Sequence, residues 1–258
     1  MADCELTWQD GIALLRLTRP AQRNAITRPI LDGIEEICEG LDAGRGRAAI
    51  ITGEGEKAFS SGTDLAESAT LNAEESLAKT RRARDLFVRM HRSEWTSVAA
   101  LNGLAYGGGL ELAMACTFRV AAPGVRLALP EVKLGVLPCY GGTQFLPPMV
   151  GRARALDMLL TGRPVERDEA LRIGLVDRIA ESLDSLLDDT HALLDDVLGK
   201  SQFAIDRIRR CVDAAVAGLT DEGLAIEEKN FLETSRSEDA REGVTAFLEK
   251  RVPQWKHR

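Results

Sequence analysis

Residues 102–116 read NGLAYGGGLELAMAC, in which a glycine-rich turn runs directly into an apolar stretch that contains one acid. The three consecutive glycines lack Cβ atoms, which suits a tight turn at the start of a helix. Backbone N–H groups at a helix start carry roughly half a positive charge, so they can stabilise a developing anion. Glu111 lies about one turn after Gly108, which lets its carboxylate face the same space as the Gly108 N–H. A glycine-packed helix with a solvated glutamate explains the stretch equally well.

Two further stretches combine a turn with a polar group. Residues 58–65, AFSSGTDL, lead from a predicted strand through a glycine toward a helix start, which can leave backbone N–H groups free. Residues 127–132, LALPEV, place Glu131 in an apolar run, and residues 135–144, GVLPCYGGTQ, predict another helix start at a glycine pair. Taken alone, each stretch is better explained as an ordinary capped turn or as a strand-end carboxylate that faces water.

Hydrophobic patterning around these stretches predicts alternating strands and helices in the first two-thirds of the chain. Apolar residues at helical spacing predict a helix that starts near Thr27 and Pro29, and a second helix over residues 73–91. Short apolar runs rich in strand formers predict strands at residues 12–17, 48–52, 97–101 and 118–122. This alternation is typical of stacked β-β-α units.

The pattern after Gly151 is helical, with almost no strand signal. Helices are predicted at residues 152–161, 182–198, 202–217, 221–234 and 239–251. These helices carry many apolar residues for so small an appendage, and we expect another subunit to cover some of them. The apolar positions that carry this expectation are Leu219, Leu224, Ile226, Phe231 and Leu232. The sequence therefore predicts one large domain with a helical C-terminal region, in an oligomer.

Composition argues against several classes of protein. The 258 residues carry a formal net charge of −7, which disfavours binding to nucleic acid or to an anionic membrane. The five cysteines show neither a C-x-x-C spacing nor a neighbouring histidine pair, so we expect reduced thiols and no metal site. No window approaches the roughly 20 apolar residues of a membrane span, and no apolar signal segment opens the chain. We therefore expect a cytoplasmic protein.

Taken together, in this order and with these intervals, the three stretches resemble the crotonase family, the enoyl-CoA hydratases and isomerases. Supporting matches extend the resemblance over essentially the whole chain: RP at 19–20, RNA at 23–25, LTGR at 160–163, GLV at 174–176, SED at 237–239 and FLEKR at 247–251. The resemblance implies an α/β fold, with a crotonase-like β-β-α spiral over residues 1–195 and an all-helical trimerisation region over residues 196–258. It also implies a homotrimer or a homohexamer.

Carried over position by position, the resemblance implies an oxyanion hole made by the backbone N–H groups of Thr63 and Gly108. Glu111 and Glu131 match the two acids of the family's hydratases, and we expect Glu131 to protonate Cα while Glu111 activates water. The two acids should titrate as a coupled pair. Contacts to an acyl-CoA substrate are expected from Arg23, Ala25, Ser61, Asp64, Leu65, Cys139, Phe247 and Lys250, the last two toward CoA bound in a neighbouring subunit. No cofactor is expected, because CoA is part of the substrate.

The leading hypothesis is an enoyl-CoA hydratase, since both acids are present. An isomerase, a decarboxylase or a thioester hydrolase of the same family would use the same oxyanion hole, and a non-catalytic RNA-binding or assembly protein is a further alternative that the acidic charge disfavours. The chain departs from the family pattern at Thr63, where a small residue is usual, at Cys139, where glycine is usual after the proline, and at Thr117, which replaces a frequent aspartate. These departures bear on substrate specificity, and the acyl group stays open.

Overall fold

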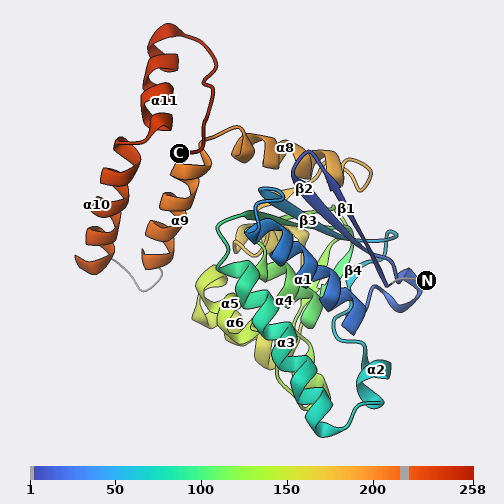
Figure 1. The fold of residues 1–258 in the computed structure, drawn as a ribbon. Coiled ribbons are helices and arrows are strands. Elements are labelled where there is room, and N and C mark those ends of the chain that lie inside the picture. Colours follow the sequence, from blue (N-terminus) through green and yellow to red (C-terminus); the bar gives the residue numbers. More distant parts are fainter. Residues whose placement is uncertain (1–2, 216–220) are drawn as a thin grey trace. The chain divides into compact units, whose positions relative to one another are not determined.

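The computed structural model describes residues 3–215 and 221–258 (Figure 1). The chain divides into two compact units, one ending at His191 and the other beginning at Ala192. This division falls inside helix α8 (Leu186–Leu198), close to the predicted domain boundary at residue 195.

The first unit contains a six-stranded sheet in the order β1-β2-β3-β5-β7-β10. Strands β1 and β2 pair antiparallel, and all the later pairs are parallel. Every residue of β3 and β5 is buried, because helices or loops cover both faces of a parallel sheet, and this explains their unbroken apolar runs. The strands are β1 (Cys4–Gln9), β2 (Ile12–Leu17), β3 (Ala48–Gly53), β5 (Thr96–Leu101), β7 (Phe118–Ala121) and β10 (Arg178–Ile179).

A second, smaller sheet has the order β4-β6-β8-β9. Its first three strands run parallel to one another, and β9 pairs antiparallel with β8. Its strands are β4 (Ala58–Ser60), β6 (Leu104–Tyr106), β8 (Arg126–Ala128) and β9 (Val165–Glu166). The chain passes from a strand of the large sheet to a strand of the small one and then into a helix, three times in succession. This repetition, together with the C-terminal helices, confirms the predicted fold class.

The helices of the first unit pack in a chain of neighbours, α1 on α3, α3 on α4, α4 on α5 and α5 on α6 (Figure 1). Helix α1 buries one stripe composed of Ile30, Leu31, Ile34, Ile37, Cys38 and Leu41, the residues whose spacing predicted it. The helical segments that precede α8 are η1 (Pro20–Gln22), α1 (Arg28–Asp42), α2 (Leu65–Ala69), α3 (Ala73–His91), α4 (Gly108–Ala115), η2 (Glu131–Leu134), α5 (Gly142–Val150), α6 (Arg152–Thr161) and α7 (Arg167–Arg172).

Features after Gly151 differ from the sequence prediction. The short strands β9 and β10 lie in the part of the chain that was predicted to be almost purely helical. Helix α8 begins at Leu186 and not at residue 182, because Ser182 and Ser185 form a hydrogen-bonded turn in which each backbone N–H donates to the other's hydroxyl oxygen at 3.0 Å. Side chains that bond to nearby backbone in this way compete with helix formation.

The second unit contains helices α9 (Gln202–Ala215), α10 (Asp221–Ser235) and α11 (Glu238–Glu249). Asp239 is buried and ties the C-terminal segment to this unit, since its carboxylate accepts hydrogen bonds from the Ser201 hydroxyl at 2.5 Å and from the backbone N–H of Lys256 at 2.6 Å. Helices α9 and α10 pack together and leave Ile208, Val212 and Phe231 about 60 % exposed or more. Of the other apolar residues named above, Leu219 and the side chains of Leu224 and Leu232 lie outside the described residues.

All five cysteines are free thiols. None of the described helices combines the length and the apolar composition that crossing a membrane requires.

Candidate active site

The three stretches singled out in the sequence meet at one edge of the small sheet. Each of them directly follows one of the parallel strands β4, β6 and β8. Because the carboxyl ends of parallel strands lie at the same edge of a sheet, the turn at Thr63, the helix start at Gly108 and the segment at Glu131 converge there. Residues separated by up to 68 positions in the chain are thus brought together by strand pairing alone.

Two backbone amides approach each other at this edge. A Cβ added to Gly108 would lie 3.5 Å from the Thr63 nitrogen, and one added to Gly62 would lie 2.9 Å from the Gly108 nitrogen. Gly62 also has φ of +95°, so this close approach requires glycine there. Neither the Thr63 N–H nor the Gly108 N–H donates to an acceptor anywhere in residues 3–215 and 221–258. The arrangement presents a pair of free donors to one point, as binding of an oxyanion requires.

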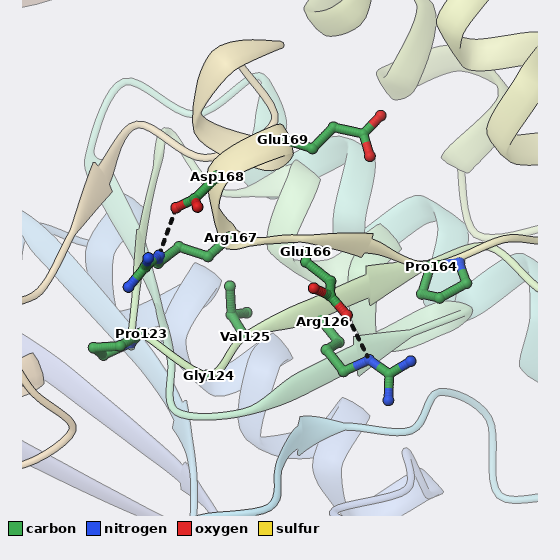
Figure 2. A pocket seen from close by; sticks show the side chains of 9 residues that line it. All are labelled: Pro123, Gly124, Val125, Arg126, Pro164, Glu166, Arg167, Asp168 and Glu169. Atoms are coloured by element: carbon green, nitrogen blue, oxygen red, sulfur yellow. Dashed lines mark hydrogen bonds and ion pairs between the residues drawn. The ribbon is translucent and has the colours of Figure 1, made fainter.

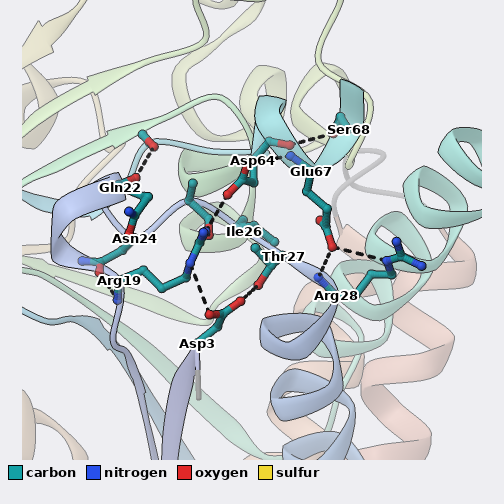
Figure 3. A network of polar contacts seen from close by, with 12 residues as sticks. Asp3, Arg19, Gln22, Asn24, Ile26, Thr27, Arg28, Asp64, Glu67 and Ser68 are labelled. Carbon is teal, nitrogen blue, oxygen red and sulfur yellow. Dashed lines mark hydrogen bonds and ion pairs between the residues drawn. The ribbon is translucent and has the colours of Figure 1, made fainter. Parts of the chain in front are cut away.

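The turn that carries Thr63 is fixed by its neighbour Ile26. The Ile26 N–H donates to the Gly62 carbonyl at 2.7 Å, and the Asp64 N–H donates to the Ile26 carbonyl at 3.0 Å. The Asp64 carboxylate caps helix α2 through the Glu67 N–H at 2.9 Å and pairs with Arg19 at 2.6 Å (Figure 3). These contacts hold the Thr63 amide in place without using its own N–H.

Glu111 is only 1 % exposed, although it is an acid in the first turn of α4. One of its oxygens, Oε1, accepts the backbone N–H groups of Tyr140 at 2.8 Å and Gly142 at 2.7 Å. Burial raises the pKa of Glu111 to about 7, and the nearby charge of Glu131 adds to this, while the N–H donors oppose it. The carboxyl can therefore gain and lose a proton near neutral pH. A solvated glutamate, the other explanation of this stretch, is not what the structure shows.

Glu131 opens the short helix η2 directly after Pro130. Its Oε2 is buried and has no hydrogen-bond partner in the described part of the chain. Its Oε1 lies 3.0 Å from the position that a Cβ on Gly107 would occupy, which places the carboxyl beside the helix start of α4. Burial raises the pKa of Glu131 as well. A strand-end carboxylate facing water does not describe this residue.

Tyr140 is a site residue that the sequence interpretation missed. Its hydroxyl accepts a hydrogen bond from the Thr63 hydroxyl at 2.7 Å, and its ring lies 2.9 Å from the position of a Cβ on Gly108. The ring is buried, with its edge toward Phe87 at a centroid distance of 5.7 Å. The only sequence signal was an aromatic residue set between a proline-cysteine pair and two glycines.

Five of the residues expected to contact substrate lie in the two segments that surround the Thr63 turn. Arg23 is exposed, and its carbonyl accepts the Ser61 N–H at 2.9 Å. Ala25 is buried, with its carbonyl bonded to Arg19 at 3.0 Å, whereas Leu65 is 64 % exposed at the start of α2. The Asp64 carboxylate is engaged by the cap and the ion pair described above. The exposed groups of this cluster are the Arg23 and Leu65 side chains.

The remaining three expected contacts lie elsewhere. Cys139 lies next to Tyr140 and is exposed as a residue, but partial burial of its thiol raises the pKa of that group to about 11, and the charges of Glu111 and Glu131 add to the rise. Phe247, which is 82 % exposed, and Lys250, which caps α11 with φ of +55°, belong to the second unit.

A separate pocket lies beside strands β8 and β9 (Figure 2). Its cations are turned toward acids of the same pocket, Arg126 toward Glu166 at 3.9 Å and Arg167 toward Asp168 at 2.8 Å. Because these charges pair with one another, the pocket has little net charge with which to attract an ionic ligand. The pocket is lined by Pro123, Gly124, Val125, Arg126, Pro164, Glu166, Arg167, Asp168 and Glu169. No group of three or more His, Cys, Asp or Glu side chains in the described ranges is placed to hold a metal ion.

The β-β-α spiral and the paired amides at its sheet edge define the crotonase class of proteins. The chain belongs to the enoyl-CoA hydratase/isomerase family, whose model matches residues 7–258. It is 35 % identical to the crotonyl-CoA hydratase of Syntrophomonas wolfei over 244 residues, covering 94 % of each chain. It is 32 % identical to the short-chain-enoyl-CoA hydratase of Clostridium acetobutylicum, covering 93 % of this chain and 92 % of that protein.

Solved structures agree with this assignment. The enoyl-CoA hydratase of Bacillus anthracis superposes with a TM-score of 0.94 at 29 % identity, over 99 % of this chain and all of that one. DspI of Pseudomonas aeruginosa superposes with a TM-score of 0.92 at 35 % identity, over 99 % and 97 %. The protein is thus an enzyme of the crotonase family. An acyl-CoA substrate is consistent with this family.

Proposed function

We propose that the protein is an enoyl-CoA hydratase, which adds water across the 2,3 double bond of an enoyl-CoA thioester to give 3-hydroxyacyl-CoA. The observation that carries the proposal is the pair of carboxyls, the buried Glu111 and the half-buried Glu131, beside two free amides. An oxyanion hole alone serves any enolate-forming reaction, whereas hydration also needs one group to take a proton from water and another to give a proton to carbon. The names of the two hydratase relatives support the same choice.

In the proposed reaction the thioester oxygen accepts hydrogen bonds from the Thr63 and Gly108 amides. Ionised Glu111 takes a proton from water as the water oxygen forms a bond to Cβ. The π electrons move toward the thioester oxygen, which becomes an enolate held by the two amides. The enolate then collapses as protonated Glu131 gives its proton to Cα, so one proton enters the acid pair and one leaves it. Losing either amide donor would cost about 3 kcal/mol of transition-state stabilisation.

The raised pKa values of both acids support this division of labour. Two carboxyls that lie near each other and are at least partly buried resist double ionisation, so we expect the pair to share one proton near neutral pH. Glu111 accepts two backbone N–H bonds, which favour its charged form, while Glu131 Oε2 has no donor in the described residues and favours the protonated form. The proposed reaction therefore starts from the form of the coupled pair in which Glu111 is ionised and Glu131 carries the shared proton.

The first test is the loss of enoyl absorbance when crotonyl-CoA is mixed with the purified protein. The wild-type protein should consume the conjugated thioester and yield 3-hydroxybutyryl-CoA, and Glu131→Gln and Glu111→Gln should each reduce the rate by at least about 100-fold. A panel of longer and aryl enoyl-CoA thioesters then defines the acyl group. Migration of the double bond without uptake of water would establish an isomerase and contradict the hydratase proposal.

We also propose that the protein is a homotrimer or a dimer of trimers and needs no cofactor beyond the CoA of its substrate. Support for assembly comes from the exposed apolar side chains of Ile208, Val212 and Phe231, which line one surface between α9 and α10. Light scattering on a sizing column gives the mass directly, and a monomer at micromolar concentration would contradict this part of the proposal. Binding of CoA by Arg23, and by Phe247 and Lys250 from a neighbouring subunit, stays a prediction, as does the cytoplasmic location.

A further inference from the structure

Tyr140 connects the acid pair to the oxyanion amides. Its backbone N–H donates to Glu111 Oε1 at 2.8 Å, and its hydroxyl accepts the Thr63 hydroxyl proton at 2.7 Å. Its ring covers Gly108 so closely that a Cβ there would lie 2.9 Å from two ring carbons. One residue therefore touches a proposed acid and both residues that supply the free amides.

The phenol group is held rigidly and away from bulk water. Tyr140 is 2 % exposed, and the edge-to-face contact with Phe87, with ring planes at 88°, fixes the ring. Burial raises the pKa of Tyr140 to about 12, so the phenol keeps its proton at neutral pH. Little conformational freedom remains for the hydroxyl group.

The hydroxyl proton of Tyr140 has no acceptor in the structure as described. Because Thr63 donates in their hydrogen bond, the Tyr140 oxygen acts there as the acceptor, and its own proton must point in another direction. No hydrogen bond donated by the phenol occurs within residues 3–215 and 221–258. A buried donor without a partner is costly, which indicates that a ligand or a water supplies the acceptor.

We infer that the Tyr140 hydroxyl is a third hydrogen-bond donor to the thioester oxygen and is oriented by the Thr63 hydroxyl. The oxygen that binds between the Thr63 and Gly108 amides lies next to the ring that covers Gly108 and next to the side chain that holds the phenol. A chain of bonds from Thr63 to Tyr140 to the enolate polarises each member and strengthens as negative charge builds. This assignment also gives a function to Thr63, the larger residue at a position where the family usually has a small one.

The inference rests on the proposed oxyanion site, so its test must separate the two. Acetoacetyl-CoA is a suitable probe, because its enolate absorbs ultraviolet light that the keto form does not, and the fraction bound as enolate reports on donor strength without any hydration step. The informative variants are Tyr140→Phe, which removes one oxygen, and Thr63→Val, which removes the hydroxyl that orients it. Thr63→Ser keeps the hydroxyl, and all three keep the backbone amides.

A hydrogen bond to a charged group corresponds to a 10- to 100-fold effect. Tyr140→Phe should therefore lower kcat for crotonyl-CoA by about 10- to 100-fold with a small change in KM, and should lower the bound enolate fraction of acetoacetyl-CoA in parallel. Thr63→Val should also lower kcat and the bound enolate fraction, whereas Thr63→Ser should keep most of both. The double variant Tyr140→Phe/Thr63→Val should lose little more than Tyr140→Phe alone. Thr190→Val, which deletes a buried hydroxyl on α8 that bonds to Leu186, serves as the matched control and should change neither readout.

The outcomes are distinct. If wild-type protein hydrates crotonyl-CoA and Tyr140→Phe matches it in kcat and in enolate fraction, the inference is overturned and the proposed function stands. If wild-type protein hydrates no enoyl thioester but stabilises the acetoacetyl-CoA enolate in a manner that depends on Tyr140, the hydratase proposal fails and the third donor stands. Independent, multiplicative losses in Tyr140→Phe and Thr63→Val would show that the two hydroxyls do not act as a pair.

Discussion

Replacing Glu111 by glutamine should stabilise the protein at alkaline pH while it inactivates the site. Glu111 is 1 % exposed, and burial raises its pKa from 4.5 to about 7. A carboxyl with a raised pKa binds its proton more tightly in the folded protein than in the unfolded chain. Its contribution is therefore fully present below pH about 4.5 and is lost as the pH rises through about 7. A pKa shift of this size corresponds to about 3 kcal/mol of unfolding free energy.

The glutamine variant removes this pH dependence and preserves the local geometry. Its side-chain carbonyl can still accept the N–H groups of Tyr140 and Gly142, which bond to Oε1 in the wild-type protein. Urea unfolding of both proteins should be measured from pH 4.5 to 8.5. Over this range the free energy of unfolding of the variant, relative to that of the wild type, should rise by about 3 kcal/mol. Glu5→Gln is the control, because Glu5 is exposed on the edge strand β1 and its carboxylate is hydrated in both states.

The same samples should lose hydration activity, so stability and function move in opposite directions. A stability difference between Glu111→Gln and wild type that stays constant across this pH range would contradict this prediction. A variant that becomes relatively less stable as the pH rises would contradict it as well. Either result would mean that the buried carboxylate is compensated in the folded protein, and that its pKa is not raised.

Three further predictions follow from the site and its support. Gly108→Ala should reduce kcat by about 100-fold or more, because the new methyl group would lie 3.5 Å from the Thr63 nitrogen and 2.9 Å from the Tyr140 ring. Gly124→Ala is the control and should keep wild-type kinetics, because its methyl group meets nothing within 4 Å. The hydration rate should fall as the pH drops below about 7, with a midpoint that belongs to the coupled acid pair, and a rate that stays flat to pH 5 would contradict the role of ionised Glu111. Asp64→Asn should lower the free energy of unfolding in urea at pH 7 by about 2 kcal/mol, because it removes the charge that pairs with Arg19. The Glu67 N–H and Arg19 hold the pKa of Asp64 below its usual value. The difference in unfolding free energy from wild type should therefore disappear as the pH falls below about 4.

Local sequence patterns predicted much of the fold. The helix over residues 73–91 coincides with α3, and the apolar stripe around Ile34 coincides with the buried face of α1. The strands β4, β6 and β8 were not all recognised, because three residues are too few to show an alternating pattern. The strands β4, β6 and β8 align the site, since their shared edge brings the Thr63 turn, Gly108 and Glu131 together.

Local sequence patterns were sufficient to predict most of the helices, four strands of the large sheet, the family and two unusual acids, because helix period, glycine runs and acids in apolar stretches are properties of neighbouring residues. Only the tertiary structure decided what those acids and amides meet. Glu131 Oε2 is left without a donor in the described residues, and the Tyr140 hydroxyl reaches Thr63 across 77 positions of chain. Such contacts depend on the strand pairing of the small sheet and on the packing of α5 against α4, and burial there sets the pKa values on which the chemistry rests. No local pattern encodes that burial.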